Sequence, residues 1–334
     1  MRGRPLRAAA VGVLWAAGLA ALAPRVLGGQ ASAPLLTARQ QFQVGHFAVA
    51  AATLQNAIPS DPNDAALYYW LGRCYFELNN FDQAAAQEER AVKLDGRNSE
   101  YHQWLGRAYG QQADAHHSLW LGVKTRNEFA EAVDLDPKNI EARRNLAEFY
   151  TDAPWIVGGS KGKARQQIAA IAALNPVQGA LAQAEYDRET GDVAGALAEY
   201  QQVLQRDSPT MNEYVEIADY YARRGDAATL QRIITGMAGV APSDSRLPYY
   251  RGVALTIEGK QLGEAESYLK AYLATTVDRS DYPLHANART WLGHVYEELG
   301  RKLEAAEQYR AALGIDPNSS FAKDSLKQLE KQMH

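Results

Sequence analysis

The segment Ala153–Ala164, APWIVGGSKGKA, contains the residue types of a phosphate-binding loop. Two glycines, a serine and a Gly-Lys pair precede an apolar run, and loops of this kind hold phosphate groups on backbone N–H groups and a lysine. The full pattern G-x-x-x-x-G-K-[ST] needs glycine at Val157 and serine or threonine at Ala164, and both positions differ. The segment also follows a helical pattern, whereas a phosphate loop follows a strand. We therefore expect a chain reversal here, and no nucleotide or other cofactor.

The histidines do not form a metal-binding pattern. His116 and His117 are adjacent and so point in different directions on a helix, and neither His-x3-His nor Glu-x2-His spacing occurs. Four others fall in separate repeats of the array described below: His46, His102, His285 and His294. No metal site is predicted.

Cys74 is the only cysteine, which excludes an intramolecular disulfide and any site with several cysteine ligands. It lies in YWLGRCYFEL, a helical apolar pattern, so a buried and unreactive thiol is expected. The motif G-x-S-x-G is absent. No catalytic residue is predicted and the protein is expected not to be an enzyme, although residues brought together across the fold could still form a site.

Internal repetition indicates which elements position these residues. Two segments, Leu67–Asn98 and Thr290–Asn318, share one spacing of Leu-Gly, tyrosine and alanine. The first has Leu71, Gly72, Tyr75, Ala84 and Ala91, and the second has Leu292, Gly293, Tyr296, Ala305, Tyr309, Ala312 and Pro317. Both strongly resemble the tetratricopeptide repeat family. The resemblance implies an all-α fold, a right-handed superhelical solenoid of stacked antiparallel helix pairs.

The resemblance extends over residues 31–334. A period of about 34 residues predicts roughly eight repeats in residues 32–319 and a C-terminal capping helix at 320–334. The repeats start near residues 31, 65, 99, 140, 177, 211, 245 and 286, and those at 177 and 245 are degenerate. Close approach of the paired helices is expected at Gly72, Gly106 and Gly293, and helix crossings at Ala84 and Ala305.

Two insertions interrupt the period. The turn Ala153–Gly162 is five residues longer than its counterpart, and we expect Ser160 to cap a helix that starts near Lys161. Seven further residues lie between Tyr109 and Pro137, which would add about one turn to each helix of the preceding pair. Both features are similar to secreted bacterial members of the family with an enlarged middle repeat and an AP...GG...KA turn.

The insertions also place large apolar residues in neighbouring loops. We expect Trp155 and Ile156 to pack against the lengthened hairpin near Trp120, with an exposed docking patch as the alternative.

The N-terminal residues predict export. Arg2, Arg4, Arg7 and Arg25, no acidic residue, and the apolar stretch 8–23 describe a secretory signal at 1–31, cleaved after Ala31. An uncleaved anchor and an organelle presequence are the alternatives, so membrane attachment is expected only through an uncleaved signal. Without these residues 31 basic residues face 39 acidic ones, a net charge of −8 that disfavours nucleic-acid binding.

The expected function is recognition. Members of the family commonly bind proteins or peptides in the groove that is lined by the first helix of each repeat. The groove positions of three repeats are Tyr69, Arg73, Phe76, Gln103, Arg107, Arg144 and Glu148. The lysines and asparagines of the family's carboxylate clamp are missing there. We expect the three arginines to tolerate exchange for glutamate without unfolding, because they are assigned to an exposed face.

The sequence thus predicts a non-catalytic scaffold or adaptor for protein or peptide partners, secreted or periplasmic, from a bacterium. Two alternatives remain: a self-associating structural protein of the cell envelope, and an enzyme whose site is assembled across repeats. The oligomeric state stays open.

Overall fold

The computed structural model describes residues 32–206, 209–275, 279–280 and 282–333. The predicted signal lies outside these residues. The described chain forms helices, turns and loops without a β-strand, and it divides into two compact units that meet in sequence between Arg206 and Asp207. None of the described helices is long and apolar enough to cross a membrane.

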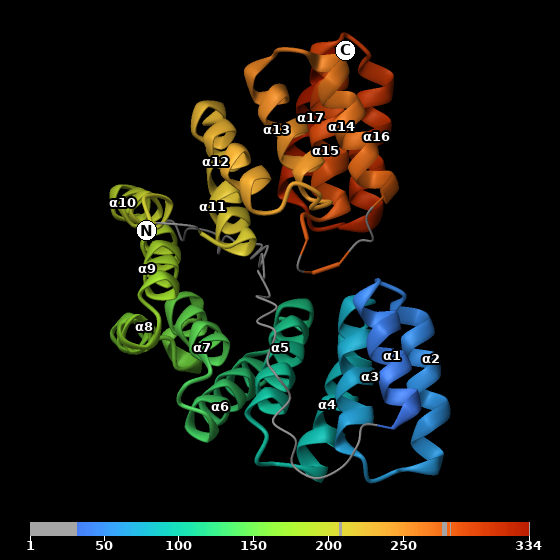
Figure 1. The fold of residues 1–334 in the computed structure, drawn as a ribbon, viewed down its shortest axis with the longest axis vertical. Helices are drawn as coiled ribbons and strands as arrows, with labels where there is room; N and C mark the ends of the chain where they lie inside the picture. Colours follow the sequence, from blue (N-terminus) through green and yellow to red (C-terminus); the bar gives the residue numbers. More distant parts are fainter. Residues whose placement is uncertain (1–31, 207–208, 276–278, 281, 334) are drawn as a thin grey trace, which may run out of the picture. The chain divides into compact units, whose positions relative to one another are not determined.

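The first unit contains five consecutive helix pairs. Each pair is closed by a short turn, and the second helix of a pair packs on the first helix of the next, as Figure 1 shows from α1 in blue onward. The pairs are α1 (Ala33–Gln43) with α2 (Phe47–Ala57), α3 (Ala65–Glu77) with α4 (Phe81–Leu94), α5 (Ser99–His116) with α6 (Leu119–Leu135), α7 (Ile140–Asp152) with α8 (Lys161–Leu174), and α9 (Pro176–Thr190) with α10 (Val193–Leu204). Short 3₁₀ helices lie at Ile58–Ser60 and Trp155–Val157, the latter labelled η2.

The second unit repeats this arrangement and ends in an unpaired helix. Its helices are α11 (Met211–Arg224), α12 (Ala227–Val240), α13 (Leu247–Glu258), α14 (Leu262–Thr275), α15 (His285–Glu298), α16 (Lys302–Ile315) and α17 (Ser320–Met333). The last helix packs on both α15 and α16. Stacked antiparallel pairs within each unit confirm the expected all-α solenoid.

Small residues allow the paired helices to approach closely. A Cβ on Gly106 would meet the Phe129 ring at 2.6 Å, and one on Gly293 would overlap the Tyr309 ring. Ala84 and Ala305 are buried where the pairs cross. These are the positions that the repeat pattern predicts. Cys74 is buried as expected, and burial raises the pKa of its thiol to about 12.

The extra residues of the third pair extend its helices. Helices α5 and α6 contain 18 and 17 residues, against 13 and 14 in α3 and α4. The enlarged turn after α7 forms η2 and ends at Ser160, whose side chain accepts a hydrogen bond from the Lys163 N–H, so the predicted cap is confirmed. Gly158 closes η2 with a φ of +106°, a conformation that favours glycine.

The predicted packing of Trp155 and Ile156 against the α5–α6 hairpin is wrong. Trp155 is 84% exposed and Ile156 is 59% exposed. Their neighbour Val157 is buried instead, and a Cβ placed on Gly122 in α6 would lie 3.7 Å from its side chain. The Arg126 guanidinium also donates a hydrogen bond to the Val157 carbonyl, at 3.2 Å. Val157 therefore attaches the turn to α6, whereas Trp155 and Ile156 face solvent.

Candidate functional site

Three of the predicted groove residues of α3 and α5, Arg73, Phe76 and Arg107, surround a tryptophan. The guanidinium carbons of Arg73 and Arg107 lie 3.6 and 3.8 Å from the centroid of the Trp104 ring, and the Phe42 and Phe76 rings lie about 5 Å from these two cations. Trp104 is almost fully buried. Burial, followed by the charge of Arg73, lowers the pKa of Arg107 to about 10.

Most of these side chains are structural. Tyr69, Phe76, Gln103 and Arg107 are buried, and Arg73 is half-buried. The Tyr69 hydroxyl donates to Glu100 and accepts from Arg73, both at 2.8 Å. The expectation that the arginines tolerate glutamate without unfolding therefore conflicts with this packing, because a buried carboxylate beside Trp104 would be costly. These residues contribute to the packing of α3 on α5, and their predicted role in partner binding stays a prediction.

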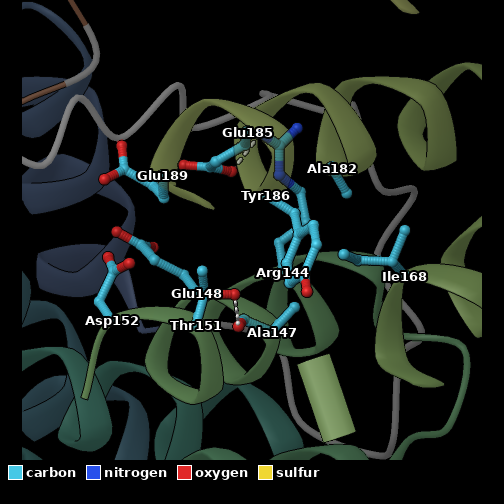
Figure 2. A pocket seen from close by; sticks show the side chains of 10 residues that line it. All are labelled: Arg144, Ala147, Glu148, Thr151, Asp152, Ile168, Ala182, Glu185, Tyr186 and Glu189. Atoms are coloured by element: carbon cyan, nitrogen blue, oxygen red, sulfur yellow. Dashed lines mark hydrogen bonds and ion pairs between the residues drawn. The ribbon is translucent and has the colours of Figure 1, made fainter. Parts of the chain in front are cut away.

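Arg144 and Glu148 lie in a separate pocket formed by α7, α8 and α9 (Figure 2). The cavity itself measures only about 10 Å³, roughly the space of one water molecule, and the rest of the space between its walls is open to solvent. Ala147, Ile168, Ala182 and Tyr186 give it an apolar wall, and its polar lining is Arg144, Glu148, Thr151, Asp152, Glu185 and Glu189.

Helical spacing brings these side chains together. In α7, Arg144, Glu148 and Thr151 follow one another at four and three residues, and in α9, Glu185 and Glu189 are four apart, so each set shares one helix face. The Asn139 and Asn175 side chains cap the N-termini of α7 and α9. Packing of α7 on α9 then places the two faces opposite each other.

Acidic groups outnumber basic ones in this pocket. Arg144 pairs with Glu185 at 3.3 Å and also donates to Gln178 at 3.2 Å. Arg188, just outside the lining, pairs with Glu189 at 2.9 Å and lies 3.8 Å from Glu185. Arg144 and Arg188 therefore face four carboxyl groups, which belong to Glu148, Asp152, Glu185 and Glu189.

Burial and the excess of carboxyl groups over arginines raise the pKa values of Glu148 and Asp152. Burial, then the charges of Glu185 and Asp152, raises the pKa of Glu148 well above its ordinary value, against the opposing effect of Arg144 and Arg107. Loss of hydration, then the charges of Glu189 and Glu185, raises the pKa of Asp152 to about 6. A cation in the pocket would reverse both shifts, because it favours the ionised carboxylates. The arrangement favours a positive charge at the mouth of the pocket.

Sequence reasoning found two of the ten residues that line this pocket. Arg144 and Glu148 are the fifth and ninth positions of their repeat, and Glu185 is the ninth position of the next repeat. Applying the same rule for groove positions to the next repeat would have identified Glu185. Among the described residues, no group of three or more His, Cys, Asp or Glu side chains is placed to hold a metal ion.

Comparison with known proteins identifies the repeats. The tetratricopeptide repeat family model matches residues 35–99 and 260–320, one segment in each unit. One segment of each unit therefore matches the tetratricopeptide repeat model. No curated protein matches the chain.

Solved structures with similar folds include repeat proteins of distant sequence. A tetratricopeptide repeat protein from Parabacteroides merdae is 16% identical over 89% of this chain and 97% of its own, with a TM-score of 0.46. A chain of the APC/C hetero-tetramer Cut9-Hcn1 is also 16% identical over 89% of this chain, with a TM-score of 0.49. The present chain spans 55% of that chain's length.

Proposed function

We propose that the protein is a non-catalytic scaffold that binds a partner protein through a basic segment. The observation that supports this proposal is the pocket between α7 and α9, where four carboxyl groups surround an apolar wall. A lysine or arginine side chain would lie across the mouth of the pocket and place its charge near Glu148, Asp152 and Glu185. The buried Arg73–Trp104–Arg107 stack would hold the preceding helices rigid beside it.

A peptide selection tests this proposal. Random peptides displayed on phage are selected on the immobilised protein, and their affinities are then measured by fluorescence anisotropy. We expect lysine or arginine in the selected peptides. The double variant Glu148→Gln/Glu185→Gln should bind them about 30-fold more weakly, because the cation loses both nearest charges. The control Glu298→Gln/Glu307→Gln removes two exposed charges from α15 and α16 and should not change the affinity.

The same measurement has a pH dependence. Since binding a cation requires Asp152 to be ionised, affinity should rise as pH increases through about 6, and Asp152→Asn should flatten this rise. Peptides without basic residues, or equal affinity for the wild type and the α7–α9 variant, would refute the proposal.

We also propose that the protein acts outside the cytoplasm. The support is the order of a basic start, an apolar stretch and a small-x-small site in residues 1–31. N-terminal sequencing of the protein from its native source should give Ser32 as the first residue. A mature chain that still begins at Met1 would contradict cleavage.

A further inference from the structure

Four large apolar side chains are exposed where the turn after α7 meets the start of α6. Leu119 and Trp120 lie in the first turn of α6 and are 56% and 64% exposed, and Trp155 and Ile156 in η2 are 84% and 59% exposed. Helix α6 and η2 are in contact, and the hydrogen bond from Arg126 to the Val157 carbonyl joins the two segments. We call these four residues the apolar tip. Soluble proteins seldom leave such a group in water unless it meets another surface.

Basic residues outnumber acidic ones around the apolar tip, although the Glu89 carboxylate lies 3.7 Å from the Lys124 ammonium. The segments 115–127 and 153–174 contain no aspartate or glutamate, although the whole chain has 39 acidic and 35 basic residues. Lys161, Lys163 and Arg165 are exposed in the first turns of α8, directly after the tip. The Lys124 ammonium lies 4.2 Å from the centroid of the Trp120 ring. An occupant that is apolar inside and negatively charged toward Lys161, Lys163 and Arg165 would therefore complement this surface.

We propose that the apolar tip binds the surface of a membrane that contains anionic lipids. Tryptophan is favoured at the boundary between lipid headgroups and acyl chains, and lysines near it are attracted to anionic headgroups. The high exposure of Trp155 means that the tip protrudes, and a protruding group inserts more readily into a deformable interface than onto a flat protein surface. This proposal is independent of the α7–α9 pocket, which takes a cation.

A local fluorescent probe tests the proposal on the full chain. Cys74→Ala removes the native thiol, and Ile156→Cys then carries an environment-sensitive nitrobenzoxadiazole label. The matched control is Leu303→Cys, at a side chain of α16 that is 71% exposed. Residues 1–31 are present in both proteins, so their own affinity for lipid cancels in the comparison.

The label at residue 156 should gain at least about threefold in emission with phosphatidylcholine–phosphatidylglycerol vesicles and little with phosphatidylcholine alone. The label at residue 303 should respond to neither. Adding Lys161→Glu/Lys163→Glu should weaken the response at residue 156 about tenfold, and adding Trp155→Ser should do the same. No response at residue 156, an equal response at residue 303, or an equal response to neutral vesicles would overturn the proposal and favour a protein contact at the tip.

Discussion

Replacing Trp104 by alanine should lower the free energy of unfolding by about 4 kcal/mol. The ring is buried between α3 and α5, and it contacts the guanidinium groups of Arg73 and Arg107 on its two sides. Alanine would leave a cavity and would also leave two close cations without the ring that separates them. Denaturant unfolding followed by circular dichroism measures the change.

Two further variants separate the contributions of Trp104. Trp104→Leu fills part of the cavity but removes the cation–π contacts, so its free energy of unfolding should lie between those of the wild type and the alanine variant. Trp120→Ala is the control, because that ring is 64% exposed, and it should change stability by no more than about 0.5 kcal/mol. Equal effects of Trp104→Ala and Trp120→Ala would contradict the structural role of the stack.

Replacing Glu88 by glutamine should raise the free energy of unfolding at neutral and alkaline pH. Glu88 is 1% exposed, and neither carboxyl oxygen has a hydrogen-bond partner among the described residues. It lies sixteen residues after Gly72, as Tyr309 lies after Gly293, so an acid occupies the position of a large ring. Burial raises the pKa of Glu88 well above its ordinary value, although the charge of Arg73 opposes this.

The sign of the pH effect follows from this raised pKa. Because the folded state holds the proton more tightly than the unfolded state, the stabilisation from Glu88 is full below its unfolded pKa and is lost as pH rises through the folded pKa. Glu88→Gln should therefore unfold with a free energy about 1 to 3 kcal/mol higher than wild type at about pH 8, and nearly equal to it at about pH 4. Denaturant unfolding at both pH values measures this. A loss of stability at pH 8 would show that Glu88 stabilises the fold as a carboxylate, and an equal gain at both pH values would show that its ionisation is not the cause of the effect.

The fold could be predicted from the sequence because the repeat pattern encodes packing directly. Gly106 and Gly293 mark close contacts between helices, and Ser160 carries the side-chain oxygen that starts α8. The turn was harder to predict. In the run from Trp155 to Val157 all side chains are apolar, and only the backbone of η2 and Gly158 determines that Val157 faces α6.

The candidate site was predicted in part for a similar reason. Positional rules found Arg144 and Glu148, because the helical period places them on the α7 face toward α9. The rules did not reveal that Arg107 is buried or that Trp104 lies between two cations, because burial depends on how neighbouring pairs stack. The acidity of the pocket depends on α9, whose repeat departs from the common pattern at Asp187.

The extra residues of the third and fourth pairs lie in the helix ends and turns at one edge, whereas the acidic pocket lies on the faces of α7 and α9. The two regions can vary independently, because the turns and helix ends can change in length and composition while the α7 and α9 faces keep their register. Exchanging Ala153–Gly159 for a short turn like the one between α3 and α4 would remove Trp155 and Ile156 and leave Glu148 and Glu185 on their helices. A repeat stack can thus acquire a second surface by insertion without altering the first.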